Sequence, residues 1–356
     1  MRLLVRAGNA AVGVERGHVV PPEGRFDVVL AVTGGELRPG LVNAHDHLHR
    51  NHYGRLGAPL YPDAYAWGRD IHARHAAEIA RGRALPRRRA LLRGAWKNLL
   101  AGVTTVVHHD RWEADFDRGF PLRVARVRCA HSLGFEPDLA GIAAGAGPFA
   151  VHLAEGTDAA AADEVRELDR RSLLTAELLA VHVVGADADG VRRLRAAGAA
   201  IVWCPSSNLF LFGRTAPREL LAPGTDVLLG SDSLLTGAGT LLDEIRAART
   251  LGLLSDARLL DAVGGAAARR LGLPEPSLAP GAPAELAVFR RPVLEAGAED
   301  VALVVAGGVL RVLDPSLVPA LGRWGKKGTM VATDGVVRWT DQRSTLPRSS
   351  RQARRP

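Results

Sequence analysis

The sequence predicts an α/β protein, a distorted (β/α)8 TIM-like barrel with a small β-sandwich domain formed by both chain ends. The chain has 356 residues, more than the roughly 250 of a typical barrel, which leaves room for an accessory domain. In its middle, short apolar runs alternate with helix-like stretches rich in Ala, Leu, Arg and Glu. This alternation is typical of parallel strands that helices cover on both faces.

The two chain ends have a different texture, and we assign residues 1–38 and 284–340 to the β-sandwich domain. Near the start, LLVRA, VGVER and FDVVLAV are separated by Gly and Pro, which is typical of antiparallel strands. The same pattern returns in AELAVF, ALVVAGGVLRVL and MVATDGVVRW, where Gly-Gly and Asp-Gly pairs indicate turns. Two similar ends around a different middle predict that the termini meet as one domain.

The barrel is assigned to residues 39–283, where apolar runs indicate seven strands. These are Leu41–Leu48, Val103–His109, Val124–Ala130, Phe149–Ala154, Leu179–Val184, Ala199–Cys204 and Asp226–Gly230. A complete barrel needs eight, and the spacing between Ala130 and Phe149 is too short for a further strand and its helix. We therefore expect one βα unit to be degenerate, around Gly141–Ala144, or missing.

The net charge of +8 is concentrated near the end of the chain, because residues 323–356 alone carry +7. A terminus such as STLPRSSRQARRP cannot bury apolar surface, so residues 341–356 are predicted to form a basic disordered tail. Electrostatic attachment of this tail to nucleic acid is the alternative, and we consider a nucleic-acid partner the weaker interpretation.

Other features indicate a cytoplasmic protein without a membrane partner. The sequence lacks the roughly 18 uninterrupted apolar residues of a membrane helix, and its start lacks a secretory signal. Cys129 and Cys204 are too few and too isolated for a disulfide framework or a thiolate zinc site. A homodimer is left open, since dimers are the commonest closed assembly.

Polar residues gather where the predicted strands end. PGLVNAHDHLH places His45 and His47 two apart in a strand, so the pleat points both imidazoles to the same side. An isolated H-x-H also occurs for packing, but three more strand ends carry ionisable side chains. They are His152 and Glu155 in VHLAEG, His182 in LAVHVVGAD and Asp232 in VLLGSDS. Burying all of these groups together requires partners, and one cation supplies a partner to many.

This ordered set resembles the amidohydrolase superfamily, within it the single-metal branch with cytosine, guanine and S-adenosylhomocysteine deaminases and the triazine hydrolases. The matching motifs also include WCPSSNLFL, LLDEIRAAR, and GSDS where the branch usually has G-T-D-S. The resemblance implies one divalent ion held by His45, His47, His152 and Asp232. Imidazoles with a carboxylate suit zinc, with iron(II), manganese or nickel as alternatives. The segment LAGIAAGAG lacks the lysine that would bridge two metals.

The predicted function is a metal-dependent amidohydrolase acting on carbon–nitrogen bonds other than peptide bonds, most simply a deaminase. A bound cation lowers the pKa of its water to about 7, and Asp232 takes the proton. The resulting hydroxide attacks an sp2 carbon of a small nitrogenous heterocycle. His182 stabilises the developing oxyanion, and Glu155 protonates the ring nitrogen or the leaving amine. A salt-bridged rim position for Glu155 and a core position for His182 are the structural alternatives.

Substrate contacts are predicted for Arg50, Asn51, Trp67, His109 and Trp203. In HLHRNHYGRLG, Arg50 offers a bidentate fork for a carboxylate or phosphate. The structural alternative is a loop arginine that only contacts solvent. Two other functions stay open at this stage. One is hydrolysis of another C–N bond, a cyclic amide or a C–halogen bond, and the other is a non-catalytic binding protein that retains the barrel.

Overall fold

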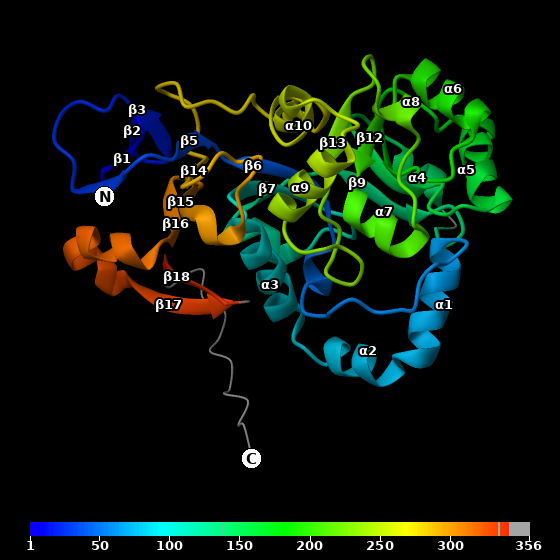
Figure 1. Ribbon diagram of the computed structural model, residues 1–356, viewed down its shortest axis with the longest axis horizontal. Helices are drawn as coiled ribbons and strands as arrows, with labels where there is room; N and C mark the ends of the chain where they lie inside the picture. The colour runs from blue at the N-terminus through cyan, green and yellow to red at the C-terminus, as the bar shows by residue number, and fades with distance from the viewer. Residues whose placement is uncertain (137, 334, 342–356) are drawn as a thin grey trace.

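A computed structural model describes residues 1–136, 138–333 and 335–341 as a mixed α/β fold (Figure 1). The middle of the chain forms two parallel sheets, one in the order β6-β7-β8 and one in the order β13-β12-β11-β10-β9. Their strands are β6 (Leu41–Asp46), β7 (Val103–His108), β8 (Arg123–Val124), β9 (Arg128–Ser132), β10 (Phe149–Leu153), β11 (Leu178–His182), β12 (Ala200–Trp203) and β13 (Val227–Leu229). Each of the seven predicted strands overlaps at least one of them.

One predicted strand, Val124–Ala130, is divided between the two sheets. Its first part is β8, which pairs with β7, and its second part lies in β9, which pairs with β10. The segment around Gly141–Ala144 is not a degenerate strand. Most of it belongs to the short helix α4 (Leu139–Ala143), where the Asp138 side chain accepts from the Gly141 N–H. Between β9 and β10 the described residues therefore supply no further strand. The eight strands β6 to β13 correspond to seven predicted ones, because one of these is divided.

Helices follow most of these strands and lie on the outside of the sheets (Figure 1). They are α1 (Ala64–Arg74), α2 (Ala76–Arg83), α3 (Arg87–Leu99), α5 (Ala159–Arg170), α6 (Ala188–Ala197), α7 (Pro205–Phe212), α8 (Arg218–Leu221), α9 (Leu241–Leu251), α10 (Asp256–Ala262) and α11 (Gly265–Arg270). Side-chain caps define several of their starts. Asp158 accepts from the third residue of its helix at the start of α5, and Asp187 does so at the start of α6.

The strands bury both of their faces, which explains why the sequence shows continuous apolar runs. In β11, Leu178 and Ala180 belong to the core shared with the helices. Leu179 and Val181 belong to a separate core made mainly of strand residues. Successive side chains of a strand point to opposite faces, so one apolar segment serves both cores.

The two chain ends share a third core. A four-stranded sheet has the order β3-β2-β1-β4, and a six-stranded sheet has the order β17-β18-β16-β15-β14-β5. Leu3 and Val5 from the first pack with Leu286 and Val288 from the second. The strands are β1 (Leu3–Ala7), β2 (Ala10–Glu15), β3 (His18–Val20), β4 (Val28–Val32), β5 (Glu36–Pro39), β14 (Leu286–Phe289), β15 (Val301–Ala306), β16 (Val309–Leu313), β17 (Gly328–Thr333) and β18 (Val336–Asp341). All their pairings are antiparallel, as predicted, except that β1 and β4 run parallel.

Two predictions concern the chain's surroundings. Among the described residues, no helix combines the length and the apolar character needed to cross a membrane. The predicted basic tail, residues 341–356, lies outside the described residues apart from Asp341.

Candidate metal centre

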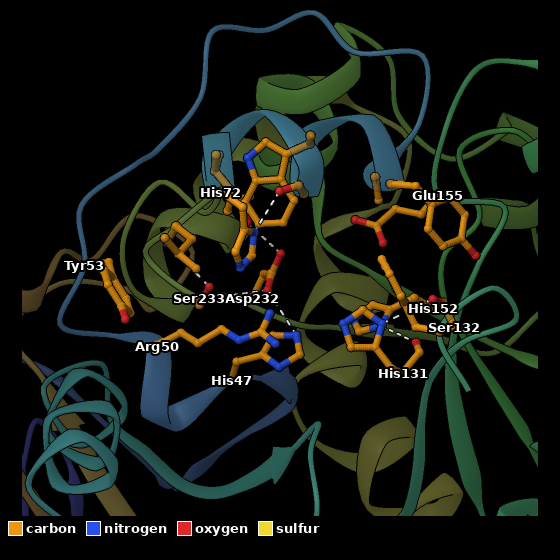
Figure 2. A pocket seen from close by; sticks show the side chains of 18 of the residues that line it. His47, Arg50, Tyr53, His72, His131, Ser132, His152, Glu155, Asp232 and Ser233 are labelled. Atoms are coloured by element: carbon orange, nitrogen blue, oxygen red, sulfur yellow. Dashed lines mark hydrogen bonds and ion pairs between the residues drawn. The ribbon is translucent and has the colours of Figure 1, made fainter. Parts of the chain in front are cut away.

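The four predicted ligands lie at one edge of the parallel sheets, and Figure 2 labels three of them, His47, His152 and Asp232. His45 lies in β6 and His47 follows it, while His152 lies in β10 and Asp232 follows β13. None is more than 6% exposed. The Nε2 atoms of His45 and His47 lie 3.6 and 3.8 Å from Oδ1 of Asp232. The carboxyl ends of parallel strands meet at the same edge, and this brings residues that are distant in sequence together.

His152 joins the other ligands from β10. The centroid of its ring lies 5.0 Å from that of His45 and 5.3 Å from that of His47. Its Nδ1 lies 2.5 Å from the carbonyl oxygen of His131. A carbonyl oxygen only accepts, so Nδ1 carries the ring proton and the Nε2 lone pair is left for a ligand. Such an outer bond, which fixes the tautomer, is the usual arrangement of a metal-binding histidine.

Several imidazole nitrogens of this site are buried without hydrogen-bond partners. Among the described residues, both nitrogens of His45 and the Nδ1 atoms of His47 and His109 have none. Burial lowers the pKa of His45, His47 and His152, which keeps the rings neutral with free lone pairs. A buried polar atom without a partner is costly unless a ligand satisfies it. Neutral imidazoles beside a carboxylate fit a divalent ion such as zinc.

Asp232 directs one carboxylate oxygen toward the histidines and anchors the other. Oδ2 accepts hydrogen bonds from the hydroxyls of Ser207 at 2.8 Å and Thr236 at 2.7 Å. Oδ1, which faces His45 and His47, accepts from the backbone N–H of Ser233 at 2.7 Å. The carboxylate is therefore fixed in rotation before any ligand binds.

The backbone near these strand ends has an unusual conformation. Asp232, His182 and Ala154 have φ angles of +50°, +71° and +49°. Residues other than glycine adopt this region at a cost of about 1–3 kcal/mol, and such positions cluster at functional sites. At Gly230, an added Cβ would lie 2.5 Å from Cβ of His45. Glycine therefore allows β13 to approach β6 closely enough to bring Asp232 beside the histidines.

Glu155 and His182 form a second polar pair beside the ligands. Oε1 of Glu155 lies 3.6 Å from Nε2 of His182. Burial raises the pKa of Glu155 to about 7, so its carboxyl group can hold and release a proton near neutral pH. Nδ1 of His182 lies 2.8 Å from Oδ1 of Asn208. This bond fixes the orientation of the ring and leaves Nε2 facing Glu155.

A cavity of about 870 Å³ opens over these residues, within the range of small-molecule sites. Glu155, His182 and Asp232 line it. Of the predicted substrate contacts, Arg50 and Trp67 also line this cavity. The indole Nε1 of Trp67 donates to the Leu56 carbonyl at 2.9 Å, which fixes the ring in the wall.

Two predicted substrate contacts, Trp203 and Asn51, are not among the residues that line the cavity. Trp203 is 0% exposed in the core, and its Nε1 donates to Oγ1 of Thr215 at 2.6 Å. The Asn51 amide donates to Oδ1 of Asp46 at 2.7 Å, and its oxygen accepts from the N–H of Leu234 at 3.1 Å. Internal bonds therefore occupy the polar groups that the prediction assigned to substrate.

His109, the remaining predicted substrate contact, lies among the metal ligands. Its ring centroid is 4.1 Å from that of His152. Ligand atoms of His45, His109 and His152 lie within 4.8 Å of one another. Nε2 of His109 donates to the Ala130 carbonyl at 2.7 Å, which leaves Nδ1 as the free nitrogen. His109 is therefore a further candidate ligand.

Comparison with family models finds no match to the chain. Two curated relatives match part of it. An aminodeoxyfutalosine deaminase from Deinococcus radiodurans is 37% identical over 98 residues, 27% of this chain and 23% of that protein. A 5-methylthioadenosine/S-adenosylhomocysteine deaminase from Pyrococcus furiosus is 32% identical over 117 residues, 30% of this chain and 27% of that protein. Each match thus spans about a quarter of the relative's length.

Solved structures match the fold over most of the chain. An adenosine deaminase from Xanthomonas campestris with bound zinc has a TM-score of 0.65 at 19% identity, covering 91% of this chain and 98% of that chain. An atrazine chlorohydrolase from Arthrobacter aurescens complexed with zinc has a TM-score of 0.69 at 18% identity, covering 91% and 100%. The local similarity to two deaminases and the fold shared with these structures agree with the resemblance predicted from the motifs.

The structure also contains a buried polar group that sequence reasoning missed. We name it the Lys97 network, and its members are Asn43, Asp46, Lys97 and Asn98. Nζ of Lys97 donates to the backbone oxygen of Asp232 at 2.6 Å and lies 3.2 Å from Oδ2 of Asp46. Asn98 bridges the network, donating to Asp46 and accepting from Asn43. The available signal was the adjacent pair Lys97 and Asn98 in GAWKNLLAG, where the other residues are apolar or glycine.

Proposed function

We propose that the chain is a metal-dependent aminohydrolase that releases ammonia from an sp2 carbon of a small nitrogenous heterocycle. The observation that carries this proposal is the group of buried, unpartnered imidazole nitrogens facing Asp232, with Glu155 beside it. The part of the chain matched by two deaminases supports it as well. A small molecule, and not nucleic acid or a membrane, is the proposed partner, because the site lies in a cavity of small-molecule size.

The proposed cofactor is one divalent ion, most simply zinc, held by His45, His47, His152 and Asp232. Bound there, it supplies a water of lowered pKa and a positive charge beside the reacting carbon. Zinc in two of the similar structures supports this choice of metal. The unpartnered nitrogen of His109 makes it the alternative imidazole ligand.

Asp232 and Glu155 are the proposed proton carriers. Oδ1 of Asp232 faces the ligand histidines, while Ser207 and Thr236 hold Oδ2, so Oδ1 is positioned to take a proton from the attacking water. Glu155, with a pKa raised to about 7 by burial, is protonated in a large fraction of molecules at neutral pH and can deliver that proton to the departing nitrogen.

His182 has a proposed role beside that of Glu155. Asn208 holds Nδ1 of the ring, so Nε2 faces Glu155 at 3.6 Å. With a proton on Nε2, His182 donates a hydrogen bond to the negative charge that develops on oxygen, while Glu155 delivers a separate proton to the departing nitrogen.

We also infer the architecture that frames this site. Strands β6 to β13 form a distorted barrel over residues 39–283, in which the divided strand β8/β9 borders two neighbours. A hydrogen bond from the Asp232 N–H to the His45 carbonyl, at 3.1 Å, supports closure between the β13 and β6 sides. Residues 1–38 and 284–340 form the proposed β-sandwich domain, supported by their common core.

The test combines metal analysis with product analysis on one preparation. We expect about one transition-metal ion per chain and ammonia release from at least one aminated heterocycle. Because a chlorohydrolase shares the fold, the same panel is scored for chloride and for carboxylate release, which reports the alternative hydrolyses. Metal content below about 0.2 ions per chain, without rescue by added zinc, manganese or iron(II), would contradict a metal-dependent enzyme.

A further inference from the structure

Arg50 enters the cavity beside the proposed metal ligands. It ends the short turn η1 (Leu48–Arg50), three residues after His47. Its side chain reaches toward His47 and Asp232, while Glu155 and His152 lie on the other side of the cavity (Figure 2). The guanidinium group is therefore close to the place where the reacting carbon of a substrate would lie.

The guanidinium group of Arg50 has no acidic partner among the described residues. Its one hydrogen bond runs from Nε to Nε2 of His49, at 3.4 Å. Two other arginines of this region, Arg87 and Arg55, have internal partners. Arg87 forms ion pairs with Asp110 and Glu113, and Arg55 donates to the Thr236 and Gly237 carbonyls. The two terminal nitrogens of Arg50 thus keep their donors available, in the fork geometry that binds carboxylates and phosphates.

Burial makes this free cation unusual. Burial lowers the pKa of Arg50 from its ordinary value, although Asp232 and Asp110 oppose the change. An arginine stays charged in proteins, so the cavity contains a partly desolvated positive charge. Glu155 does not reliably neutralise it, because its own pKa is raised to about 7. A desolvated charge without a partner is unfavourable, and a ligand of opposite charge removes that cost.

We propose that the substrate of this enzyme is anionic, carrying a carboxylate or phosphate group that Arg50 binds. The inference rests on the proposed aminohydrolase function and adds the substrate class to it. Because Arg50 lies only three residues from His47, we expect the anionic group of the substrate to be attached to the heterocycle directly or through a short linker. The rest of the cavity, about 870 Å³ in all, leaves room for a larger substituent.

Binding is measured by calorimetry with probes that lack a leaving amine, so that turnover cannot interfere. Pyrimidine-5-carboxylate is compared with pyrimidine-5-carboxamide, and purine riboside 5′-monophosphate with purine riboside. We expect the wild-type protein to prefer the anion in one pair, which identifies the group. Charged hydrogen bonds to arginine predict that Arg50→Gln weakens that anion about 10- to 100-fold and leaves its neutral counterpart unchanged. Arg50→Lys should lie between, because it keeps the charge but loses the fork.

Arg93→Gln is the matched control, since Arg93 is an exposed arginine of α3 that does not line the cavity. It should change neither affinity. Equal affinities within both pairs, no binding of either anion at millimolar concentration, or an equal loss for anion and neutral probe in Arg50→Gln would overturn the inference. Ammonia release from the corresponding amino compounds is scored separately. Anion selectivity without ammonia release would contradict the proposed function while leaving the role of Arg50 intact.

Discussion

Two buried polar groups include residues of β6 and differ in how many of their polar atoms have hydrogen-bond partners. In the Lys97 network, each buried side-chain nitrogen and oxygen has a hydrogen-bond partner. In the candidate metal centre, buried nitrogens of His45, His47 and His109 have none. Both groups are equally remote from solvent. The difference distinguishes a polar group that supports the fold from one that is arranged to receive a ligand.

The largest expected effect comes from removing a proposed metal ligand beside these unpartnered nitrogens. Asp232→Ala and His152→Ala should each lose most of the bound metal and reduce activity by about 10⁴-fold or more. The reason is that the ion lowers the pKa of water from 15.7 to about 7, and water alone is a poor nucleophile. Metal content and ammonia release are measured on the same samples. His18→Ala, at an exposed histidine of β3, is the control. Wild-type metal content in both site variants would refute the ligand assignment.

The second prediction tests whether Glu155 takes part in the chemistry without holding the metal. Glu155→Gln keeps the size of the side chain, so metal and fold should be retained. Loss of the proton donor should lower kcat by roughly 10²–10⁴-fold, the range for a positioned acid or base. Metal content and turnover are again compared on one preparation. A parallel loss of metal would make Glu155 a ligand, and full activity would make it a rim residue.

Changes in the Lys97 network should lower the stability of the folded protein. Lys97→Met leaves the Asp46 carboxylate buried without its cation, which should lower the free energy of unfolding by about 3–5 kcal/mol. Lys97→Met combined with Asp46→Asn should cost less than the sum of the single changes, because the unpaired charge is gone. Urea unfolding midpoints of the four proteins give the coupling. Strictly additive losses would show that the two side chains do not stabilise one another.

The smallest effect concerns Glu244 of α9, a fully buried carboxyl group that accepts from the N–H of Ser206 at 2.9 Å. Burial raises its pKa from 4.5 to about 7, although bonds from Ser206 oppose the shift. The folded protein therefore holds this proton more tightly than the unfolded chain. The stabilisation is complete below pH 4.5 and is lost as the pH rises through about 7, on the order of 3 kcal/mol at most.

Glu244→Gln removes this titration. Relative to wild type, the variant should gain in melting temperature as the pH rises from 5 to 8. Thermal unfolding of both proteins across this range measures the difference, and Glu275→Gln in the loop after α11 serves as the control. A difference that does not vary with pH would mean that Glu244 does not titrate between these values.

The sequence predicts the proposed metal ligands better than the Lys97 network, for a physical reason. His45 and His47 follow from strand periodicity, and His152 and Asp232 follow from the rule that strand ends meet at one edge. Those features are local. Lys97 lies on a helix, where lysine is usually solvated, and its burial depends on two loops and a strand that sequence periodicity does not place.

The dependence on tertiary packing also explains why the substrate contacts could not be predicted from the sequence. Trp203 and Arg50 were equally plausible as cavity residues, since one ends a strand and the other begins a loop. Trp203 ends β12 but bonds to Thr215 in the core, and this pairing depends on how α7 and the following loop pack. Fold class and strand positions are likewise set by local apolar patterns, whereas the division of one strand into β8 and β9 depends on pairing with two neighbours.

The shared core of the two chain ends has a consequence for synthesis. β1 and β4 pair early, but the apolar residues Leu3 and Val5 are covered only when Leu286 and Val288 arrive. Roughly 250 residues separate β4 from β14, and at about 5–20 residues per second their translation takes about 12 to 50 s. During that interval the nascent chain carries an uncovered apolar sheet. The four-stranded sheet is therefore made before the parallel sheets but covered only after them, and in the meantime its apolar face is exposed to chaperones and to aggregation.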